Sequence, residues 1–98
     1  MGRDYILSVI REYAFERWAE PERPLSRENF IQRSYRQWAI NEIVWNLKMC
    51  PDKPSLVVIE EFMDKMERFS RRNRKAGVIF STAFDVAADI LDMLSAME

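Results

Sequence analysis

The stretch that decides the fold is IQRSYRQWAINEIVWNLKM, residues 31–49. It contains no proline or glycine, and helical spacing places its apolar side chains on two opposite sides of a helix. One side collects Ile31, Tyr35, Trp38, Trp45 and Met49, and the other collects Ala39, Ile40, Ile43, Val44 and Leu47. A helix that is apolar on both sides is typically buried on both sides. The pattern therefore predicts the central helix of an all-α protein, over about residues 26–49.

Three further helices are predicted around this central one. Apolar stripes with helical spacing indicate helices over about residues 4–19, 55–75 and 82–97. Pro21 and Pro24 separate the first helix from the second, because proline removes a backbone donor and restricts the preceding residue. Short connections between amphipathic helices favour antiparallel neighbours. We therefore predict a compact antiparallel four-helix bundle that forms a single domain over residues 1–98.

The third helix has the clearest apolar stripe and the clearest expected boundaries. Gly77 is a natural left-handed residue with which to end it. Thr82, with Asp85 three residues later, is typical of a capping box that starts the fourth helix. The third stripe consists of Leu56, Val58, Ile59, Phe62, Met63, Met66 and Phe69, and the fourth of Ala83, Ala87, Ile90, Leu94 and Met97.

The composition bounds the class of protein. The 98 residues are 48% hydrophobic and 32% charged with only two glycines, which is typical of an ordered, helix-rich domain. The formal net charge of −1 gives no global electrostatic case for binding nucleic acid or an anionic membrane. Cys50 is the only cysteine, and no segment has the pattern of a signal peptide or the length of a membrane span. We therefore expect a cytoplasmic protein with no membrane association.

Few residues are suited to catalysis. Without histidine and with one cysteine, the chain has almost no ligands for zinc or haem and no Cys/His nucleophile pair. Glu61-x-x-Asp64 and Asp89-x-x-Asp92 are similar in spacing to the paired carboxylates of helical Mg²⁺-dependent nucleotide pyrophosphatases, which converge on a cavity. Here both pairs lie opposite their helices' apolar stripes and are expected to face solvent. We expect no enzyme activity, no metal and no cofactor.

A basic run near the end of the third helix permits two interpretations. Glu61 precedes Lys65, and Glu67 precedes Arg71, by the four residues that favour helical ion pairs; Asp64 and Arg68 are spaced likewise. The remaining cations would complement the helix dipole and lie beside the acidic residues of the fourth helix. Alternatively, the run contacts nucleic acid or an acidic partner, with Tyr35 available for stacking on a base. The run consists of Arg68, Arg71, Arg72, Arg74 and Lys75, and the acidic residues are Asp85, Asp89 and Asp92.

The aromatic side of the central helix also permits two interpretations. The bundle can simply enclose it, or three short helices can leave one side uncovered as an interface. Tryptophan and tyrosine at the centre of an apolar patch are typical anchors of association. The leading hypothesis is a small non-catalytic interaction module, an adaptor or regulatory protein that forms a homodimer or binds another protein. Its interface would consist of Ile31, Tyr35, Trp38 and Trp45. The alternative is a nucleic-acid-binding accessory protein that uses the basic run.

Overall fold

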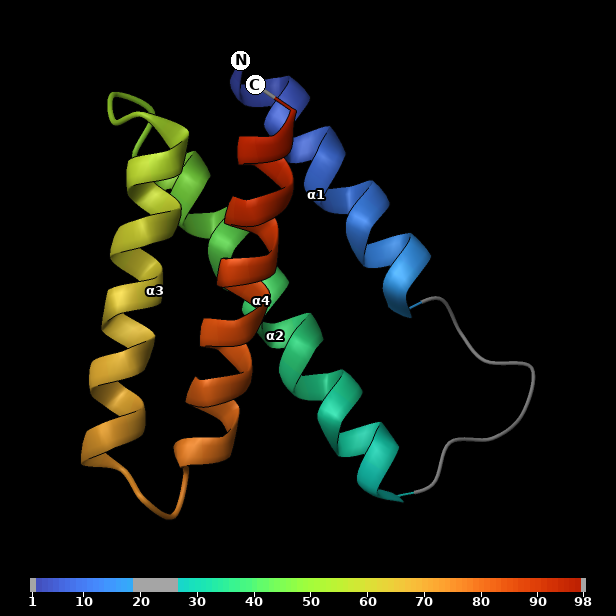
Figure 1. Ribbon diagram of the computed structural model, residues 1–98, viewed down its shortest axis with the longest axis vertical. Helices are drawn as coiled ribbons and strands as arrows, with labels where there is room; N and C mark the ends of the chain where they lie inside the picture. The colour runs from blue at the N-terminus through green and yellow to red at the C-terminus, as the bar shows by residue number, and fades with distance from the viewer. Residues whose placement is uncertain (1, 19–26, 98) are drawn as a thin grey trace.

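The computed structural model describes residues 2–18 and 27–97, and their side chains except those of residues 15–18, 28 and 29. This part of the chain consists of four helices without a strand (Figure 1). They are α1 (Arg3–Trp18), α2 (Arg27–Met49), α3 (Ser55–Arg72) and α4 (Gly77–Ala96). The prediction of an all-α four-helix bundle is confirmed. The predicted helix ends at residues 19 and 26, and the two prolines between them, lie outside the described residues.

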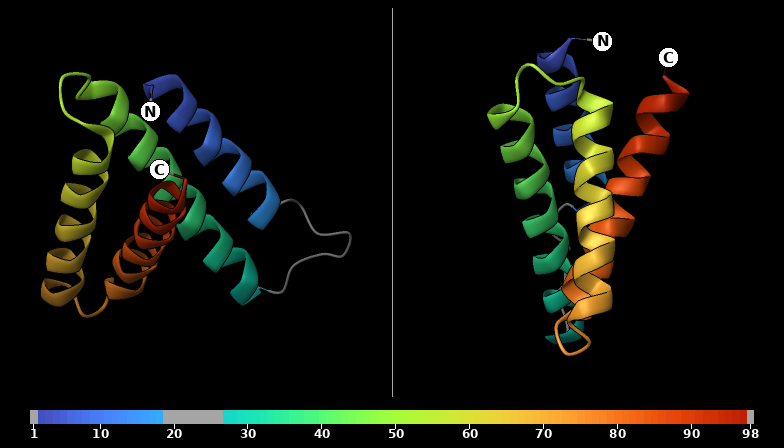
Figure 2. Two further views of the ribbon diagram at one scale, coloured as in Figure 1. Left: turned by 45° about the horizontal axis from the view of Figure 1, so that its top comes forward. Right: turned by 90° about the vertical axis from the view of Figure 1, so that its left-hand side faces the viewer.

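The helices form two hairpins that cross one another. α3 and α4 run antiparallel and share the most extensive contact, and α4 also lies across α2 (Figure 1). α2 contacts each of the other three helices, so it is central as predicted. In the right-hand view of Figure 2, α2 and α4 lie close together at their first turns and diverge toward their last turns.

The core draws one apolar stripe from each helix. The predicted stripe of α3 is confirmed, since all its members are buried or packed against the core. The predicted stripe of α4 is confirmed except at Met97, which is 45% exposed because α4 ends one residue before it. The fully buried large side chains are Ile10, Ile43, Leu47, Ile59, Ile90 and Leu94.

The two apolar sides of α2 differ in their exposure to solvent. Ala39, Ile43 and Leu47 are at most 1% exposed, because the other three helices pack against this side. On the opposite side, Trp45 and Met49 are 59% and 60% exposed. The expectation that both sides are buried is therefore wrong. Trp38 on that side is half-buried, so within the part of the chain that the structure describes the other helices cover this side of α2 only in part.

The connection between α3 and α4 differs from the predicted one. α3 ends at Arg72 and is capped by Asn73, whose backbone N–H donates to the Phe69 carbonyl at 3.0 Å. Gly77 is the first residue of α4, and no described residue has a positive φ. A Cβ at position 77 would lie 3.4 Å from the Ser70 carbonyl oxygen, which is an ordinary van der Waals contact, so neither a left-handed turn nor close approach requires glycine here. Thr82 lies in the second turn of α4, so the predicted capping box is wrong as well.

An arginine joins the start of α1 to the turn after α2. Arg3 Nη2 donates to the Cys50 carbonyl at 2.8 Å and to the Lys53 carbonyl at 2.5 Å. The Cys50 carbonyl directly follows α2, at the negative end of its dipole, where a cation is stabilising. Arg3 Nη1 is buried without a hydrogen-bond partner among the described residues, which offsets part of this gain. The clamp holds the α1–α2 hairpin together at the end away from its connection.

Arg3→Ala should therefore destabilise the fold by about 1–2 kcal/mol, because two charge-assisted hydrogen bonds are lost. Urea unfolding followed by circular dichroism measures this free energy. Arg11→Ala is the matched control, since Arg11 is an exposed cation of the same helix and should change stability by less than about 0.5 kcal/mol. Equal effects of the two substitutions would contradict the clamp.

Candidate functional site

The structure divides the predicted interface of α2 into two parts. Trp38 is half-buried, and its ring lies edge-on to Phe80 with centroids 6.3 Å apart. Phe80 in turn lies 5.3 Å from Phe69 of α3. This aromatic chain connects three helices, so Trp38 supports the fold as well as lying near the surface. Trp45, by contrast, is largely exposed.

An uncharged surface follows the outward side of α2, and we call it the outer face of α2. Its members lie within about 100° of arc on the helix and recur at intervals of three and four residues. Phe30 at one end is 61% exposed, and Trp45 at the other borders a groove of about 320 Å³ between α1 and α2. The outer face of α2 consists of Phe30, Ile31, Ser34, Trp38, Asn41 and Trp45.

A second groove brings the two predicted sites together. It has a volume of about 420 Å³ and lies between the first half of α2 and the α3–α4 connection. Ile31 and Tyr35 of the predicted interface line one wall, and Lys75 of the predicted basic run lines the other together with Val78. No sequence pattern indicates that these two predicted sites adjoin, because their proximity depends on how α2 crosses α4.

The predicted ion pairs of α3 form only in part. Arg71 Nη2 lies 2.6 Å from Glu67 Oε1, as predicted. Glu61 instead pairs with Lys53 at 3.0 Å, and the hydrogen bond to this carboxylate raises the pKa of the Lys53 amine. Lys65 lies over the ring of Phe69, with 5.6 Å between Nζ and the ring centroid. The predicted Glu61–Lys65 pair is therefore replaced by two other contacts.

The rest of the basic run is not paired with the acidic residues of α4. Arg68, Arg72, Arg74 and Lys75 are exposed, and among the described residues none lies within 4.0 Å of a carboxylate. The predicted Asp64–Arg68 pair and the expected neutralisation by α4 are therefore wrong. Asp85, Asp89 and Asp92 are exposed as predicted, but the expectation that none of them faces a cavity is wrong, because Asp85 and Asp89 line a pocket.

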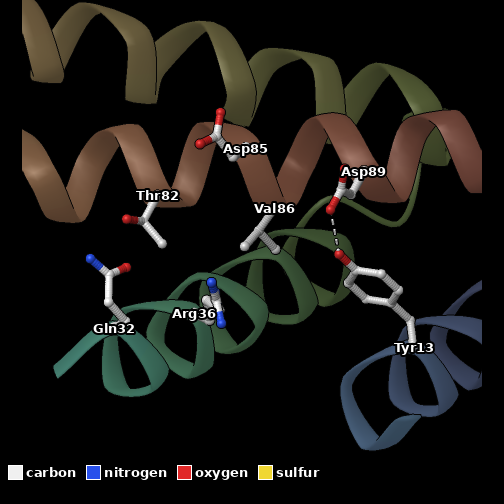
Figure 3. A pocket seen from close by; sticks show the side chains of 7 residues that line it. All are labelled: Tyr13, Gln32, Arg36, Thr82, Asp85, Val86 and Asp89. Carbon is white, nitrogen blue, oxygen red and sulfur yellow. Dashed lines mark hydrogen bonds between the residues drawn. The ribbon is translucent and has the colours of Figure 1, made fainter. Parts of the chain in front are cut away.

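A polar pocket that sequence reasoning missed lies between α1, α2 and α4 (Figure 3). It has a volume of about 350 Å³, and Val86 lies among the polar groups. Tyr13 is buried, and its hydroxyl donates to Asp89 Oδ2 at 2.8 Å. A buried tyrosine usually has a hydrogen-bond partner for its hydroxyl, so the place of Tyr13 in an apolar stripe is the sequence signal that could have indicated a polar site here. The lining residues are Tyr13, Gln32, Arg36, Thr82, Asp85, Val86 and Asp89.

The described residues hold little that is suited to metal or nucleophilic chemistry. Within them, no three Cys, Asp or Glu side chains lie close enough together to hold a metal ion. Cys50 is a free thiol that is half-buried and packed against the core. None of the helices, over the same residues, is long and apolar enough to cross a bilayer.

The chain matches no protein-family model, no curated protein and no solved structure. Its function must therefore be inferred from its own surfaces.

Tyr13→Phe should destabilise the protein by about 1 kcal/mol, because it removes the hydrogen bond to Asp89 and leaves the packing of the ring unchanged. Tyr5→Phe is the matched control, since Tyr5 is half exposed on the same helix. In a double-mutant cycle, Asp89→Ala should have no additional effect through this hydrogen bond once Tyr13 is Phe. Fully additive effects in thermal or urea unfolding would contradict the coupling.

Proposed function

We propose that this protein is a small non-catalytic interaction module that self-associates through the outer face of α2. The observation that supports this most is the absence of charge along that face from Phe30 to Trp45, in a chain that is 32% charged. Interface centres are typically depleted of charged residues and enriched in aromatic ones. Trp45 supplies a large exposed anchor of the kind that carries most of the binding energy in interfaces.

The spacing of the face suits a twofold arrangement. Ile31 and Trp45 each lie seven residues from Trp38, in opposite directions along α2. A twofold axis beside Trp38, with the two α2 helices antiparallel, brings Trp45 of each copy to Ile31 of the other. The same patch then serves both copies, as closed dimers require. This contact covers the exposed Trp45 of both copies, so burial of apolar surface is the main stabilisation of the dimer.

Trp45→Glu should weaken self-association about 30-fold or more while leaving the fold intact, because it places a charge at the interface and removes an exposed anchor. Sedimentation velocity over a concentration series measures the dissociation constant. Val57→Glu is the matched control, since Val57 is an exposed apolar residue of α3 away from the outer face of α2. A chain that is monomeric at all concentrations, or equal effects of both variants, would refute the proposal.

Trp38→Ala separates the interface from the fold. Since Trp38 packs on Phe80, this variant should lower the free energy of unfolding by about 2 kcal/mol even in the monomer. Trp45→Ala should change monomer stability far less, because Trp45 is mostly exposed. Urea unfolding at a concentration below the dissociation constant makes the comparison. An equal loss of stability would show that Trp45 is a structural residue.

Binding of nucleic acid is the second candidate function. The groove that joins Tyr35 to Lys75 favours it, since it places an aromatic ring beside a run of exposed cations. Replacing Arg72, Arg74 and Lys75 by Glu should then abolish binding to a single-stranded oligonucleotide. In fluorescence anisotropy, the affinity of the unchanged protein should fall steeply with salt, by a log–log slope of about −0.7 for each phosphate contacted. Absence of binding at low salt would remove this candidate.

A further inference from the structure

The outward face of α4 carries a second seam with helix-pairing spacing. Its members recur at alternating intervals of three and four residues, which is the spacing of residues that face a partner helix. Val78 is 53% exposed although it is apolar, and Ala88 is half-buried. The other members are exposed polar residues with short side chains, so another helix can approach closely. The seam consists of Val78, Ser81, Asp85, Ala88 and Asp92.

The charges along this seam are separated by sign. Arg74 and Lys75 lie immediately before α4, and Asp85 and Asp92 lie further along it. This order opposes the helix dipole, which favours anions at the start of a helix and cations at its end. α4 has no acidic residue in its first turn and no basic residue in its last. Within one copy, therefore, the dipole is left uncompensated at both ends.

No contact inside the described chain neutralises either set. The two cations and the two carboxylates are exposed, and no ion pair joins them to any described residue. Asp85 and Asp89 both line the polar pocket between α1, α2 and α4, but Asp89 differs because it accepts the hydroxyl hydrogen bond of Tyr13. The seam thus presents a positive end and a negative end to solvent on one helix face.

We propose that α4 pairs with α4 of a second copy in antiparallel orientation, through this seam. A twofold axis near residue 83 places Val78 opposite the partner's Ala88, and Ser81 opposite the partner's Asp85, where the serine hydroxyl can donate to the carboxylate. The α3–α4 connection of each copy, with Arg74 and Lys75, then lies over Asp92 of the other.

Only the antiparallel orientation brings the cations of one copy beside the carboxylates of the other. In a parallel pair, cations would face cations and carboxylates would face carboxylates, which is repulsive. In the antiparallel pair, the partner's carboxylates lie beside the start of α4, where the dipole favours them, and its cations lie toward the end. The partner is a second copy because the two halves of the seam are complementary to each other, as a twofold contact requires.

This contact uses other residues than the proposed contact at the outer face of α2. The two surfaces adjoin at one end, where Val78 of the seam and Ile31 of the outer face of α2 line the same groove. The two contacts also differ in physical origin. The contact through α4 is electrostatic and solvent-accessible, so salt should screen it, whereas apolar burial at α2 is not weakened by salt.

The test uses the full chain carrying Trp45→Glu, which removes the proposed α2 contact, and the unchanged chain beside it. Sedimentation velocity should detect dimers that weaken about tenfold or more between about 50 and 500 mM NaCl. Arg74→Glu with Lys75→Glu gives an acidic seam, and Asp85→Lys with Asp92→Lys gives a basic one. Each variant alone should be monomeric. An equimolar mixture of the two should form a heterodimer, and all four changes in one chain should restore the homodimer.

The matched control is Glu60→Lys with Asp64→Lys, which makes the same charge change on exposed residues of α3. It should leave association unchanged, and thermal unfolding should show that every variant is folded. A Trp45→Glu chain that stays monomeric at low salt would overturn the α4 contact. So would a mixture of acidic and basic variants that does not associate. Dimers of the unchanged chain that persist at high salt would come from the α2 contact. Their absence would count against the α2 contact alone, so each proposal can be refuted without the other.

Discussion

The structure depends on one constraint, which is that a single side of α2 serves all three other helices. Ala39 on this side, like Ala83 and Ala87 in α4, is fully buried, and alanine leaves little side chain between helices that cross. Close packing on one side of α2 leaves no helix for the other side. Exposure of Trp45 is thus a consequence of how the core is built, and the proposed α2 contact depends on it.

Local periodicity predicted the elements and the core well, because burial of a helix face repeats every three or four residues in the sequence. Ile59 and Ile90 were assigned to the correct stripes for this reason. Periodicity does not say which of two apolar sides will be covered, so the prediction that both sides of α2 are buried is wrong. The prediction for Gly77 is wrong because glycine adopts left-handed and helical conformations about equally readily, and here it has the helical one.

The site was harder to predict, because its contacts join residues that are distant in the chain. The Glu67–Arg71 pair follows from helical spacing, and it formed as predicted. Glu61 had a competitor for its local partner, since Lys53 in the preceding turn reaches the same carboxylate. Tyr13 and Asp89 are 76 positions apart, and no local pattern connects them. The groove that joins Tyr35 to Lys75 likewise exists only once the hairpins cross.

The two outward faces suggest how this small chain divides its surface. The face of α2 is uncharged and aromatic, so it can exclude water but does little to discriminate orientation through charge. The seam of α4 has charged residues and short side chains. It therefore buries little apolar surface, but its charges distinguish antiparallel from parallel pairing. If both proposed contacts form, each copy has two twofold neighbours, one at α2 and one at α4, and the dimers extend into a larger assembly. Salt would then act on only one of the two contacts, which makes ionic strength a control on the size of the assembly that leaves the α2 dimer intact.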